Sequence, residues 1–115
     1  MSLPPPAAND GPIDLDHLRR MTLGDSGLER EVLAMFSKQA ARLVGLLAAL
    51  PPETSAFAHT LKGSARAIGA HRVADRSGEL EATIREGSDP AQALAELDAA
   101  VAEARAAIEA MLPRP

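Results

Sequence analysis

Residues 59–70 read HTLKGSARAIGA, and this stretch carries both a packing pattern and the candidate chemistry of the chain. An α-helix turns by about 100° per residue, so residues three or four positions apart share a face. One face carries Phe57, Leu61, Ala65 and Ile68, which predicts an amphipathic helix from about Glu53 to Ile68. The polar face, within about 60° of His59, carries Lys62, Gly63, Arg66 and Ala70. The histidine is therefore expected to point away from the core, between two cations.

Gly63 lies one turn from His59 on this polar face. A glycine in the middle of a helix costs about 1 kcal/mol relative to alanine, and this chain uses alanine almost everywhere else that it needs a small helical residue. We interpret Gly63 as space for a bulky partner to approach the imidazole. The alternatives are that His59 is an ordinary surface histidine and that Lys62 and Arg66 only form a solvated face.

Residues 59–65 have the order histidine, two residues, lysine, glycine, serine and alanine, and Gly69-Ala70 follow. This pattern resembles the histidine-containing phosphotransfer (HPt) domain family. The resemblance implies a helical bundle that relays a phosphoryl group to and from aspartates of response-regulator receiver domains, with Nε2 of His59 as the acceptor. Family members also place an acidic or amide residue on the next helix, where it hydrogen-bonds the acceptor imidazole. The matching position here is Glu81. Lys62 and Arg66 are expected to attract the acidic receiver site and to offset phosphoryl charge.

The same resemblance implies the partners, which are receiver domains and a sensor or hybrid histidine kinase of a two-component phosphorelay. The receiver would supply Mg²⁺, and the chain is expected to need no metal or cofactor of its own. It would be a phosphoryl carrier rather than a classical enzyme. Because the sequence contains no Gly-rich nucleotide loop, we expect no kinase activity.

Two alternatives stay open at this point. The chain is either a phosphorelay carrier or a pseudo-HPt module, a four-helix interaction domain that docks a partner without phosphorylation. Glu81 is the partner of His59, an ordinary surface carboxylate, or the partner of Arg85 four residues later on the same helix.

Composition excludes several other classes of function. The net charge of −4 argues against a nucleic-acid partner, because binding to phosphates requires a basic face. The absence of cysteine excludes disulfides and thiolate metal sites. The longest apolar run, around residues 43–50, is far shorter than the ~20 residues that span a bilayer. We therefore expect a cytoplasmic protein that binds neither nucleic acid nor membrane.

The N-terminal part of the sequence contains a proline-rich segment followed by two predicted helices. Residues 1–12 are rich in proline and are expected to be a flexible leader, and residues 13–115 are expected to form one HPt-like domain. A short helix should follow Asp14. A capping box, Ser26 with Glu29, then predicts the start of a long helix.

This long helix should continue to about Leu50, before two prolines. Its apolar positions have helical spacing and are expected to face the core: Leu28, Val32, Met35, Phe36, Leu43, Leu46 and Leu50. Gly69 should end the next helix in the left-handed conformation, and two more helices should follow, ending near Gly87 and Met111. The expected fold is all-α, an antiparallel up-and-down four-helix bundle with an additional short N-terminal helix as a lid.

Overall fold

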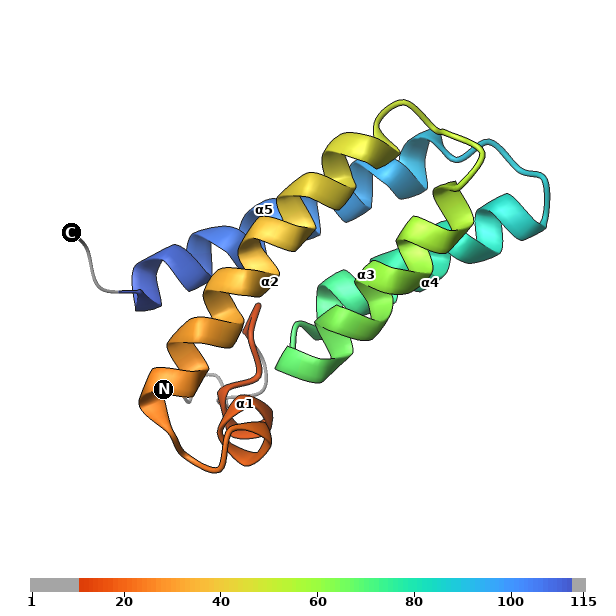
Figure 1. Ribbon diagram of the computed structural model, residues 1–115. Coiled ribbons are helices and arrows are strands. Elements are labelled where there is room, and N and C mark those ends of the chain that lie inside the picture. Colours follow the sequence, from red (N-terminus) through yellow and green to blue (C-terminus); the bar gives the residue numbers. More distant parts are fainter. Residues whose placement is uncertain (1–10, 113–115) are drawn as a thin grey trace, which may run out of the picture.

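The computed structural model describes residues 11–112, and within this range the regular secondary structure is all helical, with no strand. The helices are α1 (Leu15–Met21), α2 (Ser26–Leu47), α3 (Thr54–Ile68), α4 (His71–Arg85) and α5 (Ala91–Met111), as Figure 1 shows. The predicted all-α fold is confirmed. Of the expected leader, residues 1–10 lie outside the described residues.

The four longer helices form an antiparallel bundle, in which each helix runs opposite to the one before it (Figure 1). α2 packs against α3 and α5, and α4 packs against the same two helices, so the four close into a ring. Leucine dominates the centre, with Leu43, Leu61, Leu80 and Leu97 at most 2% exposed. Alanines at 0% exposure, such as Ala40, Ala58 and Ala65, fill the spaces between them, which compensates for the scarcity of aromatic residues.

Asp25 caps α2, and the prediction of a capping box at Ser26 is wrong. The Asp25 carboxylate accepts a hydrogen bond from the Leu28 backbone N–H at 3.0 Å, and Ser26 is the first helical residue. A carboxylate satisfies the free N–H groups as well as a hydroxyl does, and its charge also interacts favourably with the helix dipole. The helix ends at Leu47 instead of near Leu50. Leu50, which precedes Pro51, has a φ of 49° and so lies outside the right-handed helical region.

Gly69 ends α3 with a φ of 84°, in the left-handed conformation that the sequence predicted. This φ strains any residue with a side chain. A Cβ at this position would also lie only 2.8 Å from the carbonyl oxygen of Asp14. Glycine is therefore required for both reasons, and the tight turn that it makes leads directly into α4, the helix against which α3 packs.

The core face of α2 is displaced from the predicted one. Phe36 and Leu43 are buried as expected, but Leu28, Met35, Leu46 and Leu50 are at least 40% exposed. The buried positions of the helix are Leu33, Phe36, Ala40, Leu43 and Leu47. The reason is that α2 contacts α3 on one side and α5 on the other, so its buried stripe is centred between these two neighbours. On the α3 side the helix edge remains open, and Val32 and Met35 line a shallow groove there with Ser64 and Ala67.

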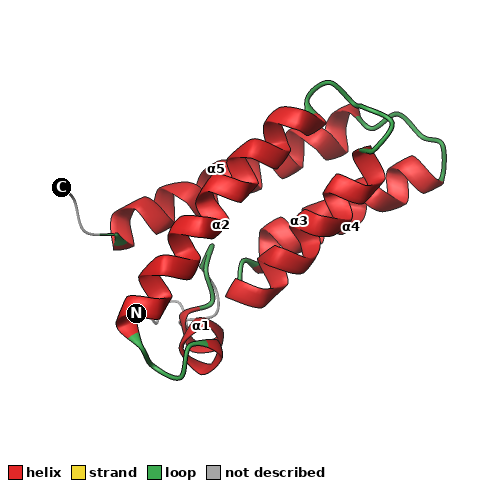
Figure 2. Ribbon diagram, in the orientation of Figure 1, coloured by secondary structure: helices red, strands yellow, loops and turns green. Residues whose placement is uncertain are grey.

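The short helix α1 lies across the turn between α3 and α4 and does not join the ring (Figure 2). The backbone N–H of Asp14 donates to the carbonyl of Gly69 at 2.8 Å. The Asp14 carboxylate lies 2.9 Å from Nε2 of His71, the first residue of α4. Nε2 of His17 lies 3.2 Å from the carbonyl oxygen of Ala67 near the end of α3. The helix is thus attached to both α3 and α4.

Substitutions in α2 can test which face of this helix is buried. Leu33 is 3% exposed and Met35 is 69% exposed. We expect Leu33→Ala to lower the free energy of unfolding by about 2–5 kcal/mol, through lost burial and the cavity left behind. Met35→Ala should change it by no more than about 0.5 kcal/mol. Urea unfolding of both variants checks this, and a larger loss for Met35→Ala would show that α2 is rotated as first predicted.

The attachment of α1 should depend on pH. The pKa of Asp14 is lowered, mainly by the hydrogen bond from the His17 backbone N–H and then by His71. A lowered carboxylate pKa stabilises the fold above the ordinary value of 3.8, and this contribution is lost as the pH falls through the native pKa. We expect Asp14→Asn to lower Tm at pH 7 and to flatten the decline of Tm between pH 5 and pH 3. Asp16→Asn, an exposed change in the same helix, is the control. Equal acid dependence in wild type and Asp14→Asn would contradict the prediction.

Candidate functional site

His59 lies near the middle of α3 with its side chain 72% exposed. The helix is anchored by its opposite face, where Ala58, Leu61, Ala65 and Ile68 are buried. Because these residues fix the rotation of the helix, the imidazole is directed outward without needing any contact of its own. The sequence-based placement of His59 on the solvent face of the helix therefore agrees with the structure.

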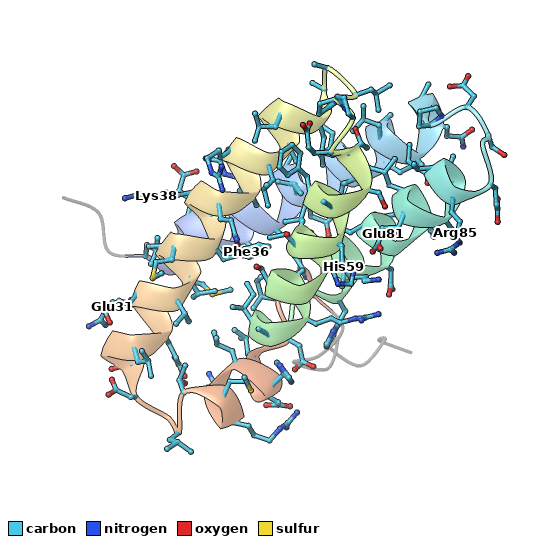
Figure 3. All side chains as sticks on the ribbon, turned by 45° about the vertical axis from the view of Figure 1, so that its right-hand side comes forward. Glu31, Phe36, Lys38, His59, Glu81 and Arg85 are labelled. Carbon is cyan, nitrogen blue, oxygen red and sulfur yellow. The ribbon has the colours of Figure 1, made fainter. Side chains whose placement is uncertain are left out.

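Glu81 reaches His59 from the neighbouring helix α4 (Figure 3). Its Oε2 lies 3.3 Å from Nδ1 of the imidazole, which is at the long end of the hydrogen-bond range. An ionised carboxylate can only accept, so Nδ1 carries the hydrogen and donates it. In the neutral ring this leaves the lone pair on Nε2, the ring nitrogen that Glu81 does not engage.

Lys62 contacts the other oxygen of the same carboxylate. Its Nζ lies 2.6 Å from Oε1 of Glu81. The Lys62 side chain is 19% exposed, against 72% for His59, so most of it is covered by the α3–α4 packing. The ammonium predicted to face a receiver is therefore already bound to Glu81.

The two contacts determine the charge of Glu81. Partial burial raises its pKa, but the hydrogen bonds and charges of Lys62 and His59 outweigh this effect and hold the pKa below the ordinary value of 4.5. The carboxylate is thus ionised at neutral pH. Its negative charge faces Nδ1, where it stabilises positive charge on the imidazole ring.

Gly63 and Arg66 complete the exposed surface around His59. A Cβ built on Gly63 would have no atom within 4 Å apart from its own helix, so the space above this position is open. Arg66 is exposed, and within residues 11–112 its side chain forms no hydrogen bond or ion pair. Of the two predicted cations, the structure thus leaves Arg66 free for a partner and engages Lys62.

Gly78 is a site residue that the sequence-based reasoning missed. It lies on α4, and a Cβ built on it would be 3.6 Å from Cδ of Lys62. The aliphatic chain of Lys62 therefore crosses from α3 to α4 over this glycine. A glycine inside α4, three residues before Glu81, was the available signal, but its meaning depends on a residue of another helix.

Glu81 and Arg85 do not form the pair that was the alternative for Glu81. The carboxylate binds Lys62 and His59, and Arg85 is exposed on α4, one turn farther along (Figure 3). Within residues 11–112 no group of three His, Cys, Asp or Glu side chains is placed to hold a metal ion. In the same range no helix is long and apolar enough to cross a membrane.

Comparison with known proteins gives one match. Residues 31–107 match the Hpt domain family, a range that contains the whole of α3 and α4 and excludes α1. No curated protein and no solved structure matches the chain. The family match covers more than half of the chain and includes His59, Lys62 and Glu81. The chain belongs to the Hpt domain family, the family of phosphotransfer modules in two-component signalling.

Proposed function

We propose that this protein is a phosphorelay carrier that accepts a phosphoryl group on Nε2 of His59 from a receiver aspartate, or from a histidine kinase, and passes it to a receiver aspartate. The observation that carries the proposal is the contact between Nδ1 and Glu81 beneath a 72% exposed imidazole. A nucleophilic histidine needs one nitrogen with a free lone pair and a partner that fixes the hydrogen on the other. His71 also faces a carboxylate, that of Asp14, but through Nε2. His59 is the histidine that meets both conditions and lies in the motif of residues 59–65.

The transfer step uses the groups of the site in defined roles. The Nε2 lone pair attacks the phosphorus of an aspartyl phosphate, and the N–P bond forms as the P–O bond to the aspartate breaks. The aspartate carboxylate leaves with the electron pair of that bond. The ring becomes a phosphorylated imidazolium with its hydrogen still on Nδ1, where the charge of Glu81 stabilises it. Transfer to the next receiver is the reverse of this step.

The partners follow from the same chemistry. The acidic site of a receiver would be attracted to Arg66, which is exposed and whose side chain has no partner among residues 11–112. Gly63 leaves room for the receiver loops to close on His59. Mg²⁺ would enter with the receiver. This role places the chain in the cytoplasm, with its receivers and its sensor or hybrid histidine kinase.

The first test is replacement of the acceptor. We expect His59→Gln to abolish uptake of phosphate from a phosphorylated receiver. Since the imidazole is mostly exposed, the free energy of unfolding should change by no more than about 0.5 kcal/mol. Radiolabel transfer and thermal unfolding measure the two effects. The label on the wild-type chain should be labile in acid and stable in base, as expected of phosphohistidine.

Two results would overturn this proposal. Undiminished labelling of His59→Gln would show that the acceptor is another residue. A wild-type chain that binds the phosphorylated receiver but takes no label would instead identify a pseudo-HPt docking module.

Substitutions at Gly63 should affect the stability of the helix and the access of the receiver to His59 in opposite directions. Because the space around its built Cβ is open, Gly63→Ala should stabilise the helix by up to ~1 kcal/mol. Gly63→Leu should slow transfer, since displacing reacting groups by about 1 Å can cost roughly 10²-fold in rate. Gly45 in α2 also has open space around it, so Gly45→Ala and Gly45→Leu are matched controls that should transfer at the wild-type rate. Wild-type transfer by Gly63→Leu would show that the receiver does not approach over Gly63.

A further inference from the structure

Polar contacts fasten the start of α1 to both ends of the turn between α3 and α4 (Figure 2). The Asp14 backbone N–H donates to the carbonyl of Gly69 at 2.8 Å, and the Asp14 carboxylate lies 2.9 Å from Nε2 of His71. Nε2 of His17 lies 3.2 Å from the carbonyl oxygen of Ala67. Carbonyls and ionised carboxylates only accept hydrogen bonds, so both imidazoles carry hydrogen on Nε2. A third element thus joins the end of α3 to the first residue of α4.

This fastening is enclosed by apolar packing. Asp14 is only 7% exposed, and Ile13 and Leu18 at 3% and 2% belong to the same buried cluster as Ile68. The turn itself is Gly69-Ala70, which offers the core nothing larger than a methyl group. The segment of α1 therefore supplies the large apolar side chains at this end of the α3–α4 pair.

The turn is the vertex of a hairpin whose two arms are equally long. His59 lies ten residues before Gly69, and Glu81 lies ten residues after His71. Each arm is about 15 Å long at 1.5 Å per residue, so opening the hairpin by about 4° would separate the facing side chains by about 1 Å. The contact between them is already 3.3 Å, so such a movement would break it.

The packing between the arms gives limited resistance to this movement. Many of the buried residues of α3 and α4 have small side chains, namely Ala58, Ala65, Ala74 and Ser77. Small side chains allow two helices to approach closely, but they form low ridges that interlock less than those of large residues. A fastening at the vertex therefore contributes to the spacing of the arms.

We infer that Asp14 and His71 are positioning residues for transfer: by fastening α1 across the turn, they hold α3 and α4 at the spacing that the Glu81–imidazole contact requires. This inference rests on the proposed function, because it assigns a distant control of the same site. Neither residue touches the reacting atoms. Their effect reaches His59 through the angle between the two helices.

The test uses the unphosphorylated chain and reads the fastening and the site in one spectrum. Nitrogen-15 NMR reports which ring nitrogen carries hydrogen, and single His→Gln replacements assign the three imidazoles. Above pH 7.5 we expect hydrogen on Nε2 of His17 and His71 and on Nδ1 of His59. Asp14→Ala should leave His59 as a mixture of both tautomers, although the change lies about 15 Å away along α3. Circular dichroism verifies that each variant is folded.

The second variant and its controls separate this effect from a general loss of stability. His71→Ala should give the same mixture, because it removes the ring that faces Asp14. His71→Gln restores an N–H donor in the place of Nε2 and should return His59 to the Nδ1 tautomer. Leu47 is 0% exposed and ends α2 at the opposite end of the bundle (Figure 1). Leu47→Ala should lower Tm more than Asp14→Ala and still keep the Nδ1 tautomer.

Transfer kinetics separate positioning from docking. At saturating receiver, Asp14→Ala and His71→Ala should lower the transfer rate about tenfold, because the reacting groups are misplaced. The receiver concentration needed should stay the same. Arg66→Glu should instead raise that concentration, most strongly at low salt.

The inference is overturned if folded Asp14→Ala and His71→Ala keep the wild-type tautomer of His59. It is also overturned if Leu47→Ala changes this tautomer to the same extent. Failure of wild type to accept phosphate, with the tautomers as expected, would instead overturn the proposed function.

Discussion

The carboxylate of Glu81 joins α3 to α4 at the position where the chain presents its histidine. One oxygen faces the ammonium of Lys62 and the other faces the imidazole of His59. Both partners belong to α3, so a single side chain of α4 determines the state of two residues on its neighbour. The lowered pKa of Glu81 is the electrostatic result of this arrangement, because the two contacts outweigh the cost of partial burial. An ionised, oriented acceptor is what a nucleophilic imidazole requires.

That contact depends on how tightly α3 and α4 pack. Gly69 reverses the chain between them with a positive φ, and the backbone of Asp14 occupies the space that a Cβ would need. α1 then binds this turn through Asp14 and His17, with contacts to Ala67, Gly69 and His71. The match to the Hpt domain family begins after this helix. α1 is thus attached at the turn on which the geometry of the site depends.

The bundle separates its packing surface from its chemical surface. The buried residues of α3 are apolar or small except at Thr54, and its exposed face carries histidine, glycine and arginine. This separation explains why substitutions at His59 and Gly63 are expected to change transfer with little loss of stability. It also explains the choice of glycine at two positions that face in different directions. Gly63 leaves space for a partner above the helix, and Gly78 leaves space for Lys62 between the helices.

The amino-acid sequence alone was sufficient to establish the helices, the outward direction of His59, the stop at Gly69 and the resemblance to the family. These features depend on residues close together in the chain, where helical periodicity and the conformational freedom of glycine act directly. Tertiary structure decided the rest. The buried face of α2 depends on its two neighbouring helices, α3 and α5. Because α2 has apolar residues on several sides, its sequence did not show which of them would be buried against these neighbours. The partner of Lys62 and the role of Gly78 depend on the register of α4 against α3. No local sequence pattern specifies this register, because the packing of both helices into one core determines it.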